Sequence, residues 1–264
     1  MPRQRTVQFE LLHPGELAEV IAQTPVAYVP CGSLEWHGEH LPLGCDAIRG
    51  QKLCVEAAKR TGGVVLPAHY IAAPGFCAYG GSIVFTPATV KRVAYELCRE
   101  LAKMGARVIV LLLAHAGAPQ YESFAEPAEQ FAREHPDVKL LVLTGGEASP
   151  KGRQIVGGGH AGPGETAECM AAAPDAVHLA HFDAEATALP RYEGLDPDTY
   201  KEGLSPAAHE GLERHMARTH WEWDPELPAK ATPEAAEQVV AAIAEGLAAR
   251  VKEVLGQVRG GASR

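Results

Sequence analysis

The feature that most constrains the fold is a run of six apolar residues, Val108 to Leu113, within the stretch "ARVIVLLLAHAG" (106–117). Because none of these side chains is polar, the run predicts a strand that is buried on both faces. Strands of this kind belong to parallel sheets that helices cover on both sides. The run ends just before His115, so the pattern places this histidine at the carboxyl end of a strand, where α/β proteins bind their ligands.

Other apolar runs alternate with helical patterns along the chain, as is typical of α/β proteins. Strands are predicted at 24–32, 64–73 and 137–146, and helices at 45–63, 86–105, 121–136 and from Thr232 to about Val258. Residues 146–164 are glycine-rich and predicted to be irregular, a short helix with Glu165 in its first turn follows, and 183–230 is predicted to be an irregular excursion with helical pieces. We expect a single domain over residues 1–264, built as a three-layer α/β/α sandwich with a mostly parallel central sheet.

Composition limits the partners of the protein. The formal net charge is −9 and no cluster of Lys or Arg stands out, which argues against a nucleic-acid partner because phosphate binding needs a basic surface. No apolar run reaches the roughly eighteen residues of a membrane span, and the N-terminus lacks the apolar run of a secretory signal. The six cysteines are spaced singly, without the pairing of a thiolate metal site. We expect a cytoplasmic protein with a small-molecule substrate and no membrane partner.

The stretch "GSLEWHGEHLPLGCD" (32–46) concentrates acids and histidines directly after the first predicted strand. Glu35 and His37 are two residues apart, so in an extended segment their side chains project to the same side. Asp46 follows at the start of a predicted helix, close enough in sequence to fold back onto them. Carboxylate and imidazole donors without thiolates suit zinc, manganese or ferrous iron.

A solvated Glu-x-His pair in a polar loop is the alternative to a metal site. Two further histidines, His115 and His160, occur at loop positions where a parallel sheet gathers its ligands. Their presence favours the metal site over the solvated pair.

Two stretches of the chain resemble the signatures of the creatininase (creatinine amidohydrolase) family. "PCGSLEWHGEHLPLGCD" (30–46) resembles the N-terminal signature of that family, and "HAGPGET" (160–166) resembles its second signature. The strand that ends at His115 lies between them, in the order of the family. The resemblance spans roughly residues 10 to 180. It implies a hydrolase that holds two divalent metal ions, with zinc as the expected metal and manganese or iron as alternatives.

The resemblance also implies a role for individual residues at the metals. Glu35, Asp46 and His115 would hold one ion. His37 and Asp46 would hold the second ion, which makes Asp46 the bridge between the two. A bridging position of this kind requires a carboxylate, because only an acid comfortably spans two ions.

The second metal site differs from the family pattern. The family completes that site with a glutamate two residues after the loop histidine, and here the position is Gly117 within "LAHAGA" (113–118). Glu165, from the second signature, is the expected substitute ligand. His160 would act as the acid and base that passes a proton to the leaving nitrogen.

These roles predict hydrolysis of an amide, cyclic amide or N-formyl C–N bond in a small polar substrate. Two alternatives stay open: a metal-dependent hydrolase that opens the ring of a keto-cyclitol or sugar-derived ketone, and a catalytically silent metal-binding assembly subunit. A pocket rich in hydroxyl-binding side chains would favour the ketone, and a flat aromatic slot would favour a lactam. The resemblance also implies a homo-oligomer, with a hexamer as the specific expectation and with Trp36 and the last helix as candidate contacts.

Overall fold

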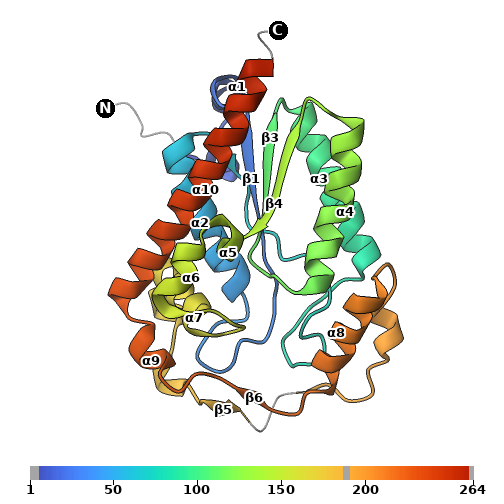
Figure 1. The fold of residues 1–264 in the computed structure, drawn as a ribbon, viewed down its shortest axis with the longest axis vertical. Helices are drawn as coiled ribbons and strands as arrows, with labels where there is room; N and C mark the ends of the chain where they lie inside the picture. The colour runs from blue at the N-terminus through green and yellow to red at the C-terminus, as the bar shows by residue number, and fades with distance from the viewer. Residues whose placement is uncertain (1–5, 187–190, 262–264) are drawn as a thin grey trace.

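The central sheet has four strands, all parallel, in the order β2-β1-β3-β4 (Figure 1). The computed structural model describes residues 6–186 and 191–261. The strands are β1 (Val26–Cys31), β2 (Val64–Val65), β3 (Val108–Leu113) and β4 (Lys139–Thr144). The predicted strands are confirmed, although β2 is much shorter than 64–73. Pro67 has no N–H to donate to a ladder, and only a single bridge between Cys31 and His69 continues the pairing.

Helices cover both faces of the sheet, so the three-layer α/β/α sandwich is confirmed. One face carries α2 (Cys45–Thr61), α7 (Pro163–Ala172) and α10 (Pro233–Gly261), and the other carries α3 (Pro87–Lys103) and α4 (Ala118–Glu134) (Figure 1). The side chains of β3 alternate between the two layers: Val108, Val110 and Leu112 face α2 and α10, and Ile109, Leu111 and Leu113 face α3 and α4. All six are at most 1% exposed, which explains why the run contains no polar residue.

The predicted helices are confirmed, with ends that shift by one to three residues, and α1 (Pro14–Gln23) adds a helix before β1. The prediction for 146–164 is wrong, because α5 (Gly145–Ala148) and α6 (Pro150–Val156) occupy much of it. Side chains cap both helices: Thr144 Oγ1 accepts from the main-chain N of Glu147 at 3.2 Å, and Ser149 Oγ accepts from that of Gly152 at 3.3 Å. Such caps start helices that are too short for hydrophobic periodicity to reveal.

The carboxyl ends of the strands point toward the end of the molecule where the 183–230 segment lies (Figure 1). Its described residues form β5 (Glu185–Ala186), which pairs antiparallel with β6 (Trp221–Glu222), and the helices α8 (Pro206–Ala217) and α9 (Leu227–Lys230). Single 3₁₀ turns occur at Phe9–Leu11, Pro174–Ala176, Leu179–His181 and Pro197–Tyr200. Leu212 of α8 packs in one cluster with Trp36 and Tyr79. Trp36 is 4% exposed, so it does not offer the subunit contact expected of it.

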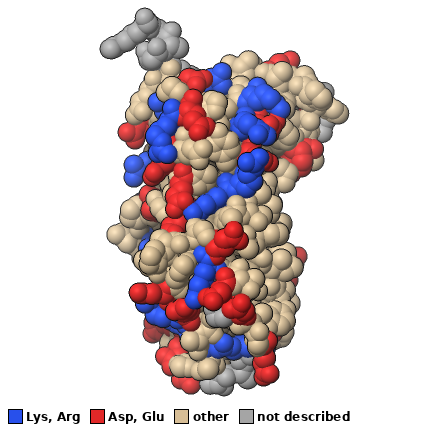
Figure 2. Space-filling model, turned by 90° about the vertical axis from the view of Figure 1, so that its right-hand side faces the viewer, with Lys and Arg blue, Asp and Glu red and all other residues tan. Residues whose placement is uncertain are grey.

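The surface over α3 and α4 carries acidic and basic side chains that are interspersed (Figure 2). Ion pairs between the two helices account for part of this mixing, as between Lys91 Nζ and Glu126 Oε2 at 2.5 Å. Neither charge sign dominates the face in this view. Among the helices of residues 6–186 and 191–261, none is long and apolar enough to cross a membrane.

Candidate metal centre

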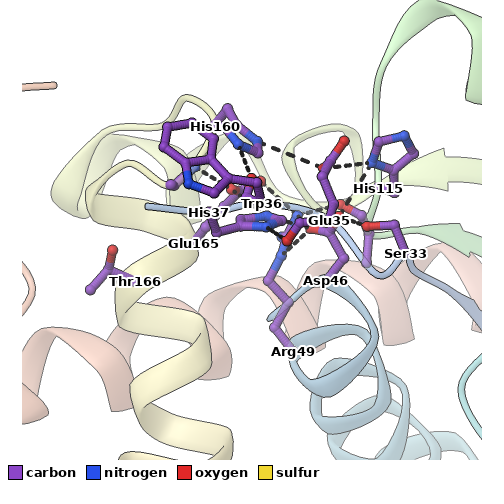
Figure 3. A network of polar contacts seen from close by, with 12 residues as sticks. Ser33, Glu35, Trp36, His37, Asp46, Arg49, His115, His160, Glu165 and Thr166 are labelled. Carbon is purple, nitrogen blue, oxygen red and sulfur yellow. Dashed lines mark hydrogen bonds and ion pairs between the residues drawn. The ribbon is translucent and has the colours of Figure 1, made fainter. Parts of the chain in front are cut away.

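Six polar side chains converge at the carboxyl end of the sheet (Figure 3). They come from the loop after β1, the first turn of α2, the end of β3, and the start of α7 with the loop before it. They are the residues that the sequence singles out: Glu35, His37, Asp46, His115, His160 and Glu165. The first four are at most 5% exposed, so little water screens their charges from one another.

Glu35, Asp46 and His115 form the first group that could hold a metal ion. His115 Nδ1 lies 3.1 Å from Glu35 Oε2 and 3.3 Å from Asp46 Oδ2. Burial alone would lower the pKa of His115, but the two carboxylates outweigh burial and hold this pKa well above its ordinary value. The other ring nitrogen, Nε2, is buried without a hydrogen-bond partner among the described residues.

His37, Asp46 and Glu165 form a second group of potential ligands. His37 Nε2 lies 3.4 Å from Asp46 Oδ1 and 3.6 Å from Glu165 Oε2. The two oxygens of Asp46 therefore face different histidines, Oδ1 toward His37 and Oδ2 toward His115. Ser33 Oγ donates to Asp46 Oδ2 at 2.7 Å and helps to fix the plane of the carboxylate. A carboxylate held in this way could bridge two ions.

The second group fits a cation. His37 Nδ1 donates to the main-chain O of Glu35 at 3.0 Å, so in the neutral ring Nε2 presents a lone pair to two carboxylates. Burial lowers the pKa of His37, but the carboxylates, Asp46 foremost, outweigh it and raise this pKa to about 9. Two donors that are each about 2.0–2.2 Å from one tetrahedral zinc ion lie about 3.3–3.6 Å apart. The distances of 3.4 and 3.6 Å from His37 Nε2 to Asp46 and Glu165 match this spacing.

His160 lies beside both groups, and its own contacts fix its orientation. Its Nε2 donates to the main-chain O of Trp36 at 2.7 Å, which leaves the lone pair on Nδ1. Nδ1 lies 3.8 Å from Glu35 Oε2, and the ring stacks on Phe76 with 3.8 Å between centroids. Burial lowers the pKa of His160 to about 3. Because Glu35, His37 and His160 form a third group of potential ligands, the geometry allows His160 to bind a metal as well as to transfer a proton.

The match to a known family covers nearly the whole chain. A model of the creatininase family, described as creatinine amidohydrolase, matches residues 10–251. The chain belongs to the creatininase family. The matched range extends beyond the two sequence signatures and takes in α8, α9 and much of α10.

Individual creatininases are distant from this chain in sequence. The creatinine amidohydrolase of Pseudomonas putida is 31% identical over 104 residues, which cover 37% of this chain and 40% of that protein. The alignment thus spans less than half the length of this curated relative. A putative creatinine amidohydrolase of Bacteroides fragilis has a TM-score of 0.73 at 23% identity, over 96% of this chain and 97% of that chain. A mutant creatininase described as a Zn-Zn type has a TM-score of 0.70 at 24% identity, over 96% and 99% of the two chains.

Arg49 is a residue of this creatininase-family site that the sequence prediction missed. Its Nη2 donates to Asp46 Oδ1 at 2.9 Å and to Glu165 Oε1 at 2.7 Å, and its Nη1 donates to Glu168 Oε2 at 2.8 Å. Nη2 also donates to the main-chain O of Ala114. Arg49 follows Asp46 by three residues on α2, so the helical spacing was a signal that could have revealed it.

Gly75 is a second missed residue, and its lack of a side chain is what the site requires. A Cβ at this position would lie 2.8 Å from Glu35 Oε1 and 2.9 Å from His115 Cε1, closer than a carbon atom can approach without displacing them. The main-chain N of Phe76, the next residue, donates to the same Glu35 Oε1 at 3.1 Å. The backbone at 75–76 therefore packs directly on the first group.

A cavity of about 300 Å³ opens beside the two groups, a size that suits a small molecule. Phe76 and Leu212 supply apolar surface, and Arg153 and His215 add polar groups on the side of α6 and α8. Gly117 also lines the cavity, at the position where the family resemblance implies a glutamate ligand. The described residues that line this cavity include no Ser, Thr, Tyr, Asn or Gln.

Proposed function

We propose that the protein is a dinuclear metal-dependent amidohydrolase that cleaves an amide, cyclic amide or N-formyl C–N bond of a small polar substrate. The observation that carries the proposal is the placement of Asp46, whose two oxygens face histidines from two separate groups of potential ligands. Membership of the creatininase family supports the class of reaction.

Five residues are proposed as ligands. Glu35, Asp46 and His115 would hold one ion, and His37, Asp46 and Glu165 would hold the other. Oxygen and imidazole donors without sulfur suit zinc, with manganese and iron as the alternatives. The similar structure described as a Zn-Zn type supports the choice of zinc. When bound, two such ions polarise a substrate carbonyl and lower the pKa of water.

His160 is proposed to move the proton. Because its Nε2–H is engaged by the main-chain O of Trp36, Nδ1 is the atom that can accept a proton from water and pass it to the leaving nitrogen. Stacking on Phe76 fixes the plane of the ring. The reaction balances: hydroxyl from water joins the carbonyl carbon, the C–N bond breaks, and the nitrogen leaves with the proton.

Neither alternative function gains support. A pocket rich in hydroxyl-binding side chains would favour a cyclic ketone, and beyond the six converging side chains the described lining adds only Arg153 and His215 as polar side chains. The apolar surface that Phe76 and Leu212 contribute to the cavity suits a flat amide or lactam better. A catalytically silent metal-binding subunit would keep the same potential ligands, so turnover of a substrate is what separates it from the enzyme.

Metal analysis of protein purified without chelator tests the proposal first. We expect about two divalent ions per chain, and a lower content in Glu35→Gln. Glu39→Gln is the matched control, because Glu39 is exposed and lies in the same loop. Hydrolysis is then assayed on a panel of lactams and formamides and on a panel of keto-cyclitols. Protein without bound metal, or turnover of ketones alone, would overturn the proposal.

A further inference from the structure

Two arginines at this site differ in what they can still bind. Arg49 is buried, and its guanidinium donates to Asp46, Glu165 and Glu168. Arg153 is exposed. In the part of the chain that the structure describes, no hydrogen bond or ion pair engages the Arg153 side chain. Arg49 is therefore committed to the protein, whereas the charge of Arg153 is available to a ligand.

Arg153 lies where it can reach a molecule bound at the candidate metal centre. It lines the cavity of about 300 Å³ together with Glu35, His115 and Glu165. It also lines an adjoining cavity of about 350 Å³. The side chain thus lines both cavities, and Glu165, a proposed ligand, lines both as well.

Glycines surround Arg153 in the sequence and in space. A Cβ at Gly152 would lie 2.7 Å from Ile243 Cγ1, so α6 packs tightly on α10. Glycines also flank the arginine itself: a Cβ at Gly146 would lie 3.5 Å from Arg153 Cδ, and one at Gly158 would lie 3.0 Å from Arg153 Nε. Because Gly146 and Gly158 have no side chains, they leave room for the Arg153 side chain beside the cavity.

We propose that Arg153 binds a carboxylate group of the substrate, so that the substrates of this enzyme are amides or lactams that carry a carboxylate. The planar fork of N–H donors on a guanidinium matches a carboxylate and keeps its charge across the physiological pH range. The inference rests on the proposed hydrolase function, because it takes the bond that is cleaved to lie at the two groups of potential ligands.

The acids that line the two cavities beside Arg153 accept hydrogen bonds from other donors. Glu165 and Glu168 accept from Arg49. Glu147, which lines the adjoining cavity, accepts from the main-chain N of Thr144 at 2.7 Å. A carboxylate that enters with the substrate therefore meets a cation that has no other partner.

Matched pairs of compounds test this inference. The pairs are 2-pyrrolidone-5-carboxylate with 2-pyrrolidone, and N-formylglycine with N-methylformamide. The kcat/KM of the zinc-loaded enzyme should be about tenfold or more higher for the carboxylated member, mainly through KM. Arg153→Gln should remove the difference and Arg153→Lys should keep part of it. Lys151→Gln is the control, because Lys151 is exposed on the same helix and should leave the preference unchanged.

Calorimetric titration of the same pairs separates this inference from the proposed function, because binding does not require turnover. A tighter Kd for 2-pyrrolidone-5-carboxylate that Arg153→Gln abolishes supports the inference even if no amide is hydrolysed. Turnover of an amide without any preference for the carboxylated member leaves the hydrolase intact and overturns the inference. An equal effect of Arg153→Gln on both members of each pair overturns it as well.

Discussion

Two sets of residues at the cavity differ in how their polar groups are satisfied. The first set, called the floor below, is made of the five proposed ligands, Glu35, His37, Asp46, His115 and Glu165. Its carboxylates accept from Arg49, Ser33 and main-chain N–H groups, and Nε2 of His37 and of His115 has no hydrogen-bond partner in the described chain. The second set, called the wall below, is made of Arg153 of α6 with Leu212 and His215 of α8, which line the cavity from opposite sides of the molecule (Figure 1). There the Arg153 guanidinium has no partner in the described chain, and His215 Nδ1 is buried without one. The carboxylates of the floor are thus held by donors of the protein itself, whereas the Arg153 guanidinium of the wall is available to a ligand.

The charges of the floor and of the wall complement each other. Arg49 and Glu168 neutralise one another in a buried pair at 2.8 Å. This leaves the carboxylates of Glu35, Asp46 and Glu165 on the floor, where two divalent ions would reverse the negative charge to a net charge of about +1. An anionic substrate would then find a positive floor and a positive wall, which agrees with the carboxylate proposed as the partner of Arg153.

The largest effect should come from breaking the floor at its shared residue. In Asp46→Asn the amide nitrogen replaces one of the two oxygens that face His37 and His115, so one group loses an acceptor and both groups lose the negative charge that they share. We expect the loss of both ions and a fall in kcat/KM of at least about 10³-fold, measured by metal analysis and by hydrolysis of the best substrate. Asp137→Asn is the control, because its side chain is 65% exposed and lies before β4, at the opposite end of the sheet. Full metal content in Asp46→Asn would show that Asp46 does not bridge.

The next largest effect should be a loss of stability when Arg49, the donor to the carboxylates of the floor, is replaced. Arg49→Met removes the donor that Asp46, Glu165 and Glu168 share, and it leaves buried carboxylates without a countercharge. The free energy of unfolding of the metal-free protein should fall by about 3–5 kcal/mol, as measured by denaturant titration. Zinc should restore part of the loss, because a bound cation replaces the missing charge.

Arg92→Met is the matched control for that measurement. Arg92 pairs with Glu96 on the surface of α3, and its side chain is 74% exposed, so the change should alter stability by less than about 0.5 kcal/mol. If Arg49→Met were as stable as Arg92→Met without metal, the buried pair would not support the floor.

The floor could be predicted from the sequence because its signals are local. Glu35 and His37 are two residues apart and Asp46 lies at the start of a helix, so one short stretch contains three of the five proposed metal ligands. His115 was placed by the apolar strand that precedes it. Because ligands gather at the carboxyl ends of parallel strands, His115 was expected to lie near that stretch. In the structure His115 lies within hydrogen-bonding distance of Glu35 and Asp46.

The wall could not be predicted in the same way. Arg153 belongs to a helix of seven residues that is started by a cap, within a stretch predicted to be irregular. His215 belongs to α8, whose place over the cavity depends on packing between segments far apart in the chain. The sequence around Arg153 and around His215 contains no motif that would distinguish either residue from an ordinary surface side chain. Such positions become visible only when the tertiary fold shows which surface they line.

A smaller effect distinguishes the two roles that the geometry allows for His160. If His160 transfers the proton, His160→Gln should lower kcat by about 10²-fold and leave the metal content unchanged. If it binds an ion, the same variant should lose metal. The control is His181→Gln, because His181 is exposed and lies outside the cavity lining. Metal analysis and kcat from one preparation decide between the two roles.

The smallest effect should come from the wall. His215→Phe keeps an aromatic ring beside Phe76 and Trp221, whose centroids lie 5.0 and 6.3 Å from that of His215, but removes the buried Nδ1. Burial lowers the pKa of His215, so we expect the change to cost at most a hydrogen bond between a neutral ring and the substrate. KM should therefore rise about 3- to 10-fold, with kcat and metal content unchanged. His220→Phe, at a side chain that is 62% exposed, should leave KM as it is. A loss of metal in His215→Phe would show that His215 also supports the metal ligands. Substrate binding and metal binding would then depend on the same residue, and the division of the cavity into a floor and a wall would be wrong.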